Sequence, residues 1–149
     1  MSLKRSDIKQ FLIDTRVSDV MVFPVITVKD TDAFALVQEK IALYDVRHLP
    51  VVDETGNIVG LISQRDLYQL HSPRKLDDGS WYYDKEALSQ FILKNVMLSK
   101  PFTLKPDSSL YEAIEATVRY KFGCIPVIDD HKKICGILTR DTILKFLTI

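Results

Sequence analysis

The side chains best suited to bind a ligand or take part in chemistry lie before the middle of the chain. Asp66 stands at the predicted start of a helix, where a carboxylate can accept hydrogen bonds from two adjacent hydroxyl groups. Ser63 opens the same helix, and its hydroxyl and the free backbone N–H groups there can meet hydroxyl or phosphate groups. Ser63 and Asp66 also have the spacing of a capping box, although Glu or Gln is the usual partner. The spacing alone favours capping, and both roles can coexist.

Two basic candidates, Arg47 and His48, stand before a predicted hairpin. Residues 51–52 form one apolar, β-branched run, and residues 58–62 form another. The residues between them are turn formers, with Gly56 free to take a positive φ. The stretch therefore reads as strand, turn, strand and helix start, with the basic pair before the first strand and the carboxylate after the second.

This unit occurs twice in the chain. Residues 123–139 repeat the Pro, Val, Asp, Ile and Gly of residues 47–63 at the same spacing, 76 positions later, and the two copies align without a gap from Val17 onward. The predicted order in each copy is strand, helix, strand, strand, helix. A unit of about 50 residues buries too little surface to be stable alone. We therefore expect the two copies to pack on each other about a pseudo-twofold axis, which creates two related clefts.

The predicted helices follow the spacing of apolar residues. After a strand at residues 26–28, the first copy has a helix to about Tyr44 whose apolar face is Phe34, Val37 and Ile41. After a strand at residues 102–104, the second copy has a helix whose apolar stripe is Leu110, Ala113, Ile114, Thr117 and Val118. Candidate capping residues are 29–31 before the first of these helices and Asp107 and Ser108 before the second.

Four segments are expected. They are a short N-terminal helix within residues 1–16, the first copy in 17–70, a linker with a helix from Asp84 in 71–92, and the second copy in 93–149. The linker carries the aromatic triplet Trp81-Tyr82-Tyr83. This triplet can pack on adjacent helices, form a partner surface or cover a ligand, and packing is the simplest account.

Composition excludes several classes of protein. With 46% hydrophobic residues the chain can build a core. Its formal net charge is zero, so the chain as a whole lacks the excess of positive charge that attracts nucleic acid. No apolar run approaches the ~20 residues needed to cross a bilayer, and the N-terminus lacks the apolar segment of a signal peptide. A cytoplasmic protein without nucleic-acid or membrane partners is therefore expected.

The cysteines and histidines point to no catalytic or metal site. Cys124 and Cys135 are too few and too simply spaced for a disulfide framework or a zinc site, and Cys135 is expected to be reduced and buried. His48, His71 and His131 are scattered, with no recognisable nucleophile and base or metal-ligand spacing. The sequence therefore argues against an enzyme.

The residues resemble a known family. Val-x-Asp-Val-Met, followed by Arg-His-Leu-Pro-Val-Val-Asp-x-x-Gly-x-Ile-Val-Gly-Leu-Ile-Ser-x-x-Asp, occurs as a tandem pattern from Val17 to about Leu147. It resembles a pair of cystathionine-β-synthase (CBS) domains, also called a Bateman module. The resemblance implies an α+β fold of two β-α-β-β-α repeats with α/β-type order, joined through their sheets. It also implies clefts for AMP, ADP, ATP or S-adenosylmethionine, a regulatory role toward an attached or partner protein, and disc-shaped dimers of two modules.

The resemblance assigns roles to particular residues. Adenine would lie between Arg47-His48-Leu49 and Thr27, or between Gly123-Cys124-Ile125 and Thr103. Asp66 and Ser63 would contact the ribose, with Thr139 as the counterpart of Ser63. Arg47 would reach a phosphate, since its charge does not depend on pH, and His48 is either a second phosphate ligand or a partly buried strand residue. The expected ligand-binding residues are thus Thr27, Arg47, His48, Leu49, Ser63, Asp66, Thr103, Cys124, Ile125 and Thr139.

The two copies are not equivalent at these positions. The first has Ser63-Gln64-Arg65-Asp66, whereas the second has Thr139-Arg140-Asp141-Thr142, so its carboxylate comes one residue early. One residue turns a helix by about 100°, which should point Asp141 away from a ribose. The second copy also has Gly123-Cys124 for the basic pair and Lys132 for the turn glycine. We expect one good nucleotide cleft, which contains Asp66, and one degenerate or empty cleft. Because sites of the family draw on both repeats, the resemblance also allows Thr103 and Ile125 to serve the Asp66 cleft while Thr27 and Arg47 serve the other.

Two functions of different classes remain from the sequence. The first is a non-catalytic sensor, a homodimer that binds an adenosine-containing small molecule and alters what it presents to an unknown regulated protein. The second is a dimerisation or protein-interaction module with vestigial clefts. Loss of nucleotide binding when Asp66 is replaced by Ala would distinguish them.

Overall fold

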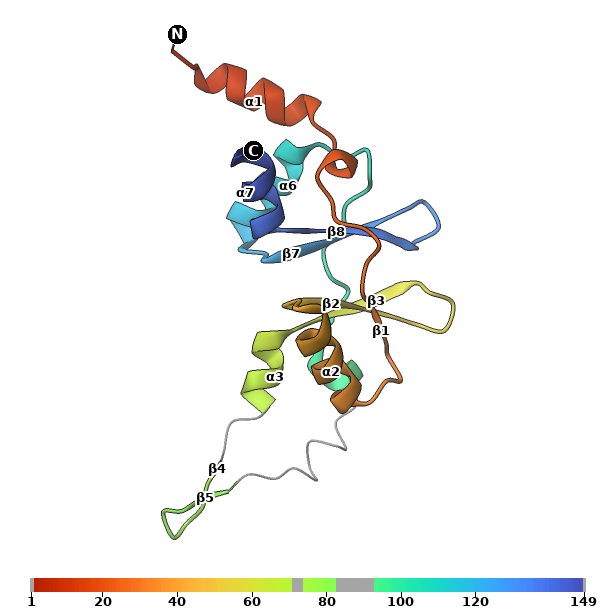
Figure 1. Cartoon of the computed structure of the whole chain (residues 1–149), viewed down its shortest axis with the longest axis vertical. Coiled ribbons are helices and arrows are strands. Elements are labelled where there is room, and N and C mark those ends of the chain that lie inside the picture. The colour runs from red at the N-terminus through yellow and green to blue at the C-terminus, as the bar shows by residue number, and fades with distance from the viewer. Residues whose placement is uncertain (1, 71–73, 83–92, 149) are drawn as a thin grey trace. The chain divides into compact units, whose positions relative to one another are not determined.

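The computed structural model describes residues 2–70, 74–82 and 93–148 (Figure 1). They form two compact units. The central unit is Ile26–Pro101, and the terminal unit joins the residues up to Val25 with those from Phe102 onward. The helix expected from Asp84 lies outside the described residues. No helix in the described ranges combines the length and the apolar character that crossing a membrane requires.

The central unit is built on a four-stranded sheet. Its elements are β1 (Val28–Lys29), α2 (Phe34–Tyr44), β2 (His48–Val52), β3 (Ile58–Ser63), α3 (Gln64–Leu70), a small hairpin of β4 (Arg74–Lys75) and β5 (Trp81–Tyr82), α5 (Leu93–Val96) and β6 (Leu98–Ser99). The strand order is β1-β2-β3-β6, with β1 parallel to β2 and the other pairs antiparallel. This confirms the predicted strand, helix, strand, strand, helix order of the first copy.

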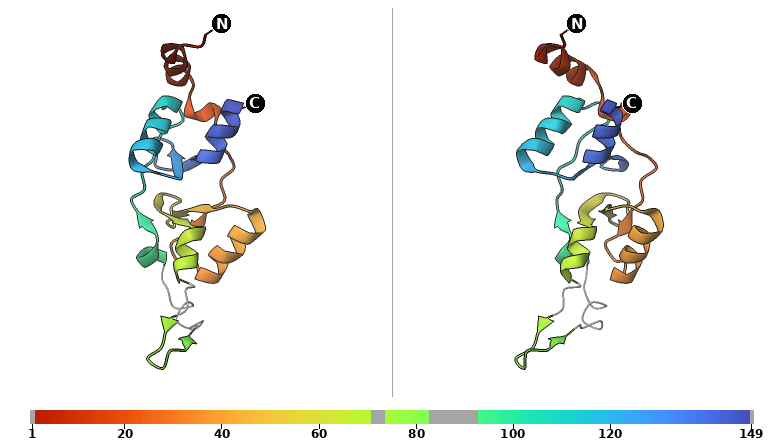
Figure 2. Two further views of the ribbon diagram at one scale, coloured as in Figure 1. Left: turned by 90° about the vertical axis from the view of Figure 1, so that its left-hand side faces the viewer. Right: turned by 60° about the vertical axis from the view of Figure 1, so that its left-hand side comes forward.

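The terminal unit repeats the hairpin and its two helices. Its elements are α1 (Arg5–Asp14), a 3-10 turn (Val17–Asp19), α6 (Leu110–Tyr120), β7 (Cys124–Ile128), β8 (Ile134–Thr139) and α7 (Arg140–Thr148). The expected strand at residues 102–104 is reduced to a single parallel bridge from Leu104 to Val127. α6 and α7 lie side by side on one face of the β7–β8 hairpin (Figure 2). The N-terminal helix is confirmed and packs on α6, with Phe11 stacked on Phe146 of α7 at 6.5 Å between ring centroids.

Each unit has its own core, and most of its residues belong to the predicted apolar faces. Val118 was wrongly expected in the apolar stripe of α6, since its side chain is 74% exposed. Val37, Ile41, Leu49, Val51 and Ile62 meet in the central unit. Their counterparts Ala113, Ile125, Val127 and Leu138 meet in the terminal unit. The two cores arise because alternate strand residues and one stripe of each helix point to the same side.

The short Val-x-Asp-Val-Met segments are exchanged between the two copies. Val17 is buried in the terminal unit, where its N–H donates to the carbonyl of Ser108 at 2.8 Å. Leu93, its counterpart at the start of the second copy, is buried in the core of the central unit. Val22 pairs with Ile137 in β8, and β6 pairs with β3. The spatial units therefore differ from the two sequence copies, because each copy donates its first segment to the other unit.

Two predicted details were wrong by a few residues. α2 begins at Phe34 after Ala33, which makes no side-chain cap, so residues 29–31 do not cap this helix. α6 is capped by Ser109, whose hydroxyl accepts from the N–H of Glu112 at 3.0 Å, whereas the hydroxyl of Ser108 accepts from Lys105. The hairpin turns are as expected, since Gly56 has φ 84° and Lys132, at the corresponding position, has φ 63°.

Candidate functional site

Four of the predicted site residues gather at one end of the β2–β3 hairpin. His48, the first residue of β2, pairs with Ser63, the last residue of β3. The N–H of Gln64 donates to the carbonyl of Arg47 at 2.8 Å, so Arg47 lies beside the start of α3. Because α3 follows β3 directly, Asp66 lies in the first turn of the helix at the same end of the hairpin.

Ser63 and Asp66 form a reciprocal capping box. The N–H of Ser63 donates to Oδ2 of Asp66 at 2.8 Å, and the N–H of Asp66 donates to Oγ of Ser63 at 3.2 Å. Within the described ranges no protein donor bonds to Oδ1 of Asp66, which leaves this oxygen able to accept from another group. The side chains of both residues are partly exposed. Capping and ligand binding are therefore compatible at this carboxylate.

The surroundings of His48 favour its neutral state. Burial lowers the pKa of the imidazole below its usual 6.5, and the nearby Arg47 lowers it further, while the Asp66 carboxylate opposes the shift. The effect of Asp66 on His48 is consistent with the two side chains lying at the same end of the hairpin. Arg47 itself is exposed. The site thus combines one fixed cation, one carboxylate and one imidazole.

Thr27 and Leu49 are the other two predicted ligand-binding residues of the central unit, and their side chains differ in exposure. Thr27 precedes β1, is partly buried, and its carbonyl accepts from Nζ of Lys40 at 2.7 Å. Leu49 has a side chain with 0% exposure inside the core. Only the backbone of Leu49 can therefore meet a ligand in this conformation.

The corresponding end of the β7–β8 hairpin has the same backbone but different chemistry. Cys124 pairs with Thr139, and the N–H of Arg140 donates to the carbonyl of Gly123 at 3.4 Å. The hydroxyls of Thr139 and Thr142 lie 2.8 Å apart, and the N–H of Thr142 donates to Oγ1 of Thr139 at 3.1 Å. A neutral pair of threonines therefore takes the place of Ser63 and Asp66.

The other predicted residues of the terminal unit are less accessible. Cys124 and Ile125 are buried, and burial raises the pKa of the Cys124 thiol to about 12. Thr103 is partly buried, and Asp141 is exposed at the second position of α7. This unit offers no carboxylate at the position of Asp66.

Both cysteines are free thiols. Cys135 is only partly buried, contrary to expectation, and its Sγ lies 3.4 Å from the carbonyl oxygen of Val127. Among the described residues no cluster of three His, Cys, Asp or Glu side chains is arranged to hold a metal ion.

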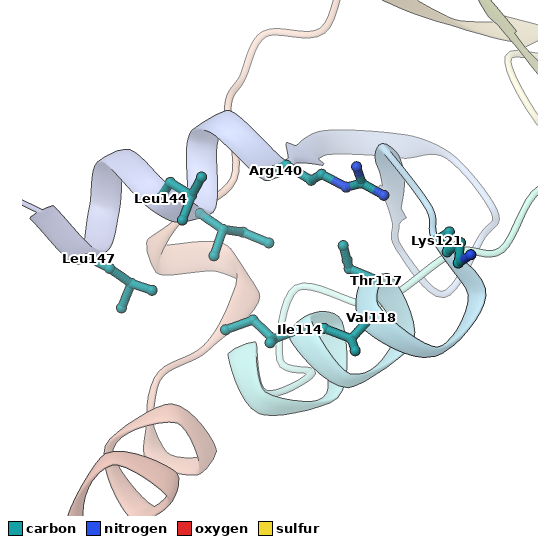
Figure 3. Close-up of a pocket in the computed structure, with 8 residues that line it drawn as sticks. Ile114, Thr117, Val118, Lys121, Arg140, Leu144 and Leu147 are labelled. Atoms are coloured by element: carbon teal, nitrogen blue, oxygen red, sulfur yellow. The ribbon is translucent and has the colours of Figure 1, made fainter.

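A groove between α6 and α7 went unnoticed in the sequence. It has a volume of about 370 Å³ and lies within the terminal unit (Figure 3). Its walls are apolar side chains of both helices, and Lys121 and Arg140 stand at one end of it. No sequence signal pointed to it, because Val118 and Leu144 are apolar residues of the type found in a core.

The family model for the CBS domain matches residues 17–71 and 93–149. The chain therefore belongs to the CBS domain family and contains two CBS domains in tandem. This confirms the resemblance and the α+β fold of two repeats.

Relatives and solved structures agree with this assignment. The chain is 29% identical over 131 residues to an L-aspartate semialdehyde sulfurtransferase of Methanosarcina acetivorans, covering 88% of the chain but only 23% of that enzyme. It is 29% identical over 130 residues to the chloroplastic CBS domain-containing protein CBSX2 of Arabidopsis thaliana, covering 76% of the chain and 53% of CBSX2.

Two solved CBS structures share the fold. The structure of CBSX2 in complex with AMP aligns with a TM-score of 0.73 at 25% identity, covering 89% of this chain and 96% of that one. The CBS domain pair of protein MJ0100, in complex with 5-methylthioadenosine and S-adenosyl-L-methionine, aligns with a TM-score of 0.73 at 22% identity, covering 89% of this chain and 95% of that one.

Proposed function

We propose that this tandem CBS pair is a non-catalytic regulatory module that binds an adenosine-containing nucleotide. The observation that carries the proposal is the gathering of Arg47, His48, Ser63 and Asp66 at one end of the β2–β3 hairpin. These groups match a ligand with two adjacent hydroxyls and an anionic tail. AMP is the first ligand to test, because CBSX2, at 25% identity, is solved in complex with AMP.

Each group has a distinct task in this proposal. Asp66 accepts hydrogen bonds from the ribose hydroxyls through Oδ1, while Oδ2 keeps its bond to the N–H of Ser63. Arg47 pairs with a phosphate, and His48 adds a proton-dependent contact to the same group. Thr27 and the backbone of Leu49 flank the adenine. None of these tasks requires a covalent step.

The terminal unit is proposed to contribute a weaker second site or none. Its threonine pair carries no charge, and Gly123 and Cys124 supply no cation where the central unit has Arg47 and His48. A ribose would lose its strongest acceptor there, since a hydrogen bond to a charged group contributes more than one to a neutral group. Residues Thr103, Cys124, Ile125 and Thr139 are therefore expected to affect binding less than Asp66.

Regulation is proposed to operate through a partner protein and a homodimer. A ligand shifts an equilibrium between two arrangements only as far as its affinities for them differ. The chain spans only 23% of the sulfurtransferase that it resembles, so the activity of that enzyme is not carried over to this chain.

Isothermal titration with AMP, ADP, ATP, NADH and S-adenosylmethionine tests the proposal. One of these ligands should bind, and Asp66→Ala should weaken that binding by at least about tenfold, because it removes a charged acceptor. Asp141→Ala is the matched control, since Asp141 lies in the first turn of α7 one residue from the position of Asp66, and it should leave binding unchanged.

The second candidate is an interaction module with vestigial sites. It is favoured by the reciprocal bonds of Ser63 and Asp66, which give this carboxylate a structural reason to be present without any ligand. Absence of binding across the whole panel by a folded protein would support this second candidate and overturn the first.

A further inference from the structure

Thr27 lies at the same end of the central sheet as the candidate ligand site. β1 runs parallel to β2, and Val28 pairs with Val51. Thr27, the residue before Val28, is therefore level with Pro50, near the start of β2, where His48 stands. β1 has only two residues and lies at the edge of the sheet. Few bonds of the sheet therefore hold the backbone at Thr27.

A lysine of α2 supplies a further bond to this backbone. Nζ of Lys40 donates to the carbonyl of Thr27 at 2.7 Å, a distance typical of a hydrogen bond from a charged donor. Lys40 stands between Val37 and Ile41 of the buried stripe of α2, and its side chain is only partly exposed. In the described part of the chain no carboxylate forms an ion pair with Lys40. The ammonium group is thus directed at a backbone carbonyl and not at an acid.

The terminal unit holds the corresponding segment in a different way. Ala116, which is buried and has no side-chain donor, occupies the position of Lys40. The counterpart of the tethered threonine is Thr103. The residue before it, Phe102, stacks its ring on that of Phe122 with 5.3 Å between centroids. The lysine tether is therefore not a requirement of the repeat fold, and it occurs in the unit that also has the charged site residues.

We propose that Lys40 is a positioning residue for the base of the bound nucleotide. By holding the carbonyl of Thr27, it sets the stretch of backbone that flanks the adenine in the proposed function, on which this inference rests. Asp66 and Arg47 act on the ribose and the phosphate instead. The groups of a binding site have to be held to within a fraction of an ångström, so a loosened backbone at Thr27 would fit the base less well. Lys40 should therefore matter for ligands that carry a base and not for ligands that lack one.

Hydrogen exchange of the ligand-free protein tests the tether itself. Lys40→Met keeps a long apolar side chain but removes the ammonium donor. The amides of residues 26–30 should then exchange at least about threefold faster, because local opening of this segment becomes easier. Glu39→Met is the matched control, since Glu39 is the exposed neighbour of Lys40 on α2, and it should leave the exchange unchanged. Unchanged exchange in Lys40→Met would overturn the proposal.

Ligand titration followed by NMR tests the role in binding. It compares AMP with ribose 5-phosphate, which has the sugar and the phosphate but no base. Lys40→Met should weaken AMP binding by about tenfold and change the affinity for ribose 5-phosphate by less than about twofold. Lys40→Arg should recover most of the AMP affinity, since a guanidinium can donate to the same carbonyl.

The outcomes separate the role of Lys40 from the proposed function. Natural affinity for AMP in Lys40→Met, or equal losses for AMP and ribose 5-phosphate, overturns the positioning role and leaves the site around Asp66 standing. A failure of Lys40→Arg to recover AMP binding also contradicts a role that depends on a donor. Absence of AMP binding by the natural protein overturns both the AMP site and the role of Lys40.

Discussion

Met97 packs its thioether directly against the backbone of Gly60, and Met21 makes the same contact with Gly136. A Cβ atom at Gly60 would lie 2.8 Å from Cγ of Met97, and one at Gly136 would lie 2.8 Å from Cγ of Met21. Met21 and Met97 occupy the same position in the two repeats, as do Gly60 and Gly136. Each repeat therefore supplies the methionine that covers the glycine of the other repeat.

Gly60→Ala should destabilise the protein. The added methyl group overlaps Met97, so the exchanged segment has to shift, and overpacking of this kind costs about 1–3 kcal/mol. Chemical denaturation followed by circular dichroism measures the change. Met97→Ala provides the matched control, because the double variant should lose less than the sum of the two single losses. Strict additivity would show that the two residues do not interact.

A fragment that contains the whole compact central unit should fold, whereas a fragment that contains only the first sequence repeat should not. Ile26–Pro101 contains the complete core of the central unit, including Leu93 and the β3–β6 pairing. Residues 17–71 lack Leu93 and β6, although they contain a complete sequence repeat. The first fragment should unfold cooperatively in urea, and the second should show no cooperative transition. Cooperative unfolding of the 17–71 fragment would contradict the structural role of the exchanged segment.

His48 should make stability depend on pH below about 6.5, the usual pKa of its imidazole. Since burial lowers the pKa of His48 in the folded protein, the unfolded chain binds more protons in this window. The contribution is complete above 6.5 and is lost as the pH falls through the lowered pKa. Asp129 and Asp130 also have lowered pKa values, but from a usual value of 3.8, so they act at more acidic pH.

His48→Gln should flatten this part of the stability profile. The measurement is the free energy of unfolding at a series of pH values, with His131→Gln as the control for an exposed histidine. An unchanged slope in His48→Gln would assign the pH dependence to other groups.

Lys132→Gly should stabilise the protein by about 0.5–1 kcal/mol. Lys132 has φ 63°, and a residue with a Cβ pays a steric cost there that exceeds the extra backbone entropy lost by glycine. Gly56→Lys, the reverse change at the corresponding turn, should destabilise by a similar amount. Thermal unfolding of both variants checks the pair, and a lower midpoint for Lys132→Gly would refute this account of the turn.

The hairpins, the main helices and the gathering of the candidate site residues in the central unit were predictable from the sequence, because these depend on local patterns. His48, Ser63 and Asp66 come together through one hairpin and one helix start, which a short stretch of residues specifies. The exchange of Val17 and Leu93 was not predictable in this way. It depends on which unit each segment packs against, and the alignment of the repeats is the same for either choice.

The exposure of individual side chains was the other feature that the sequence did not predict. Leu49 and Ile125 were expected beside a ligand, and their side chains lie in the two cores, because strand residues alternate between faces. The groove was missed for the related reason that Val118 and Leu144 look like core residues by type. Only the packed helices show that they face outward.

The most direct test of the proposed function is a titration of AMP into the natural protein and into Asp66→Asn. An asparagine oxygen can keep the bond to the N–H of Ser63, so the helix cap survives while the charge is lost. We predict one AMP bound per chain and at least about tenfold weaker binding to Asp66→Asn, with only a small loss of thermal stability in the absence of ligand. Binding of AMP to Asp66→Asn with the natural affinity would contradict a site centred on Asp66.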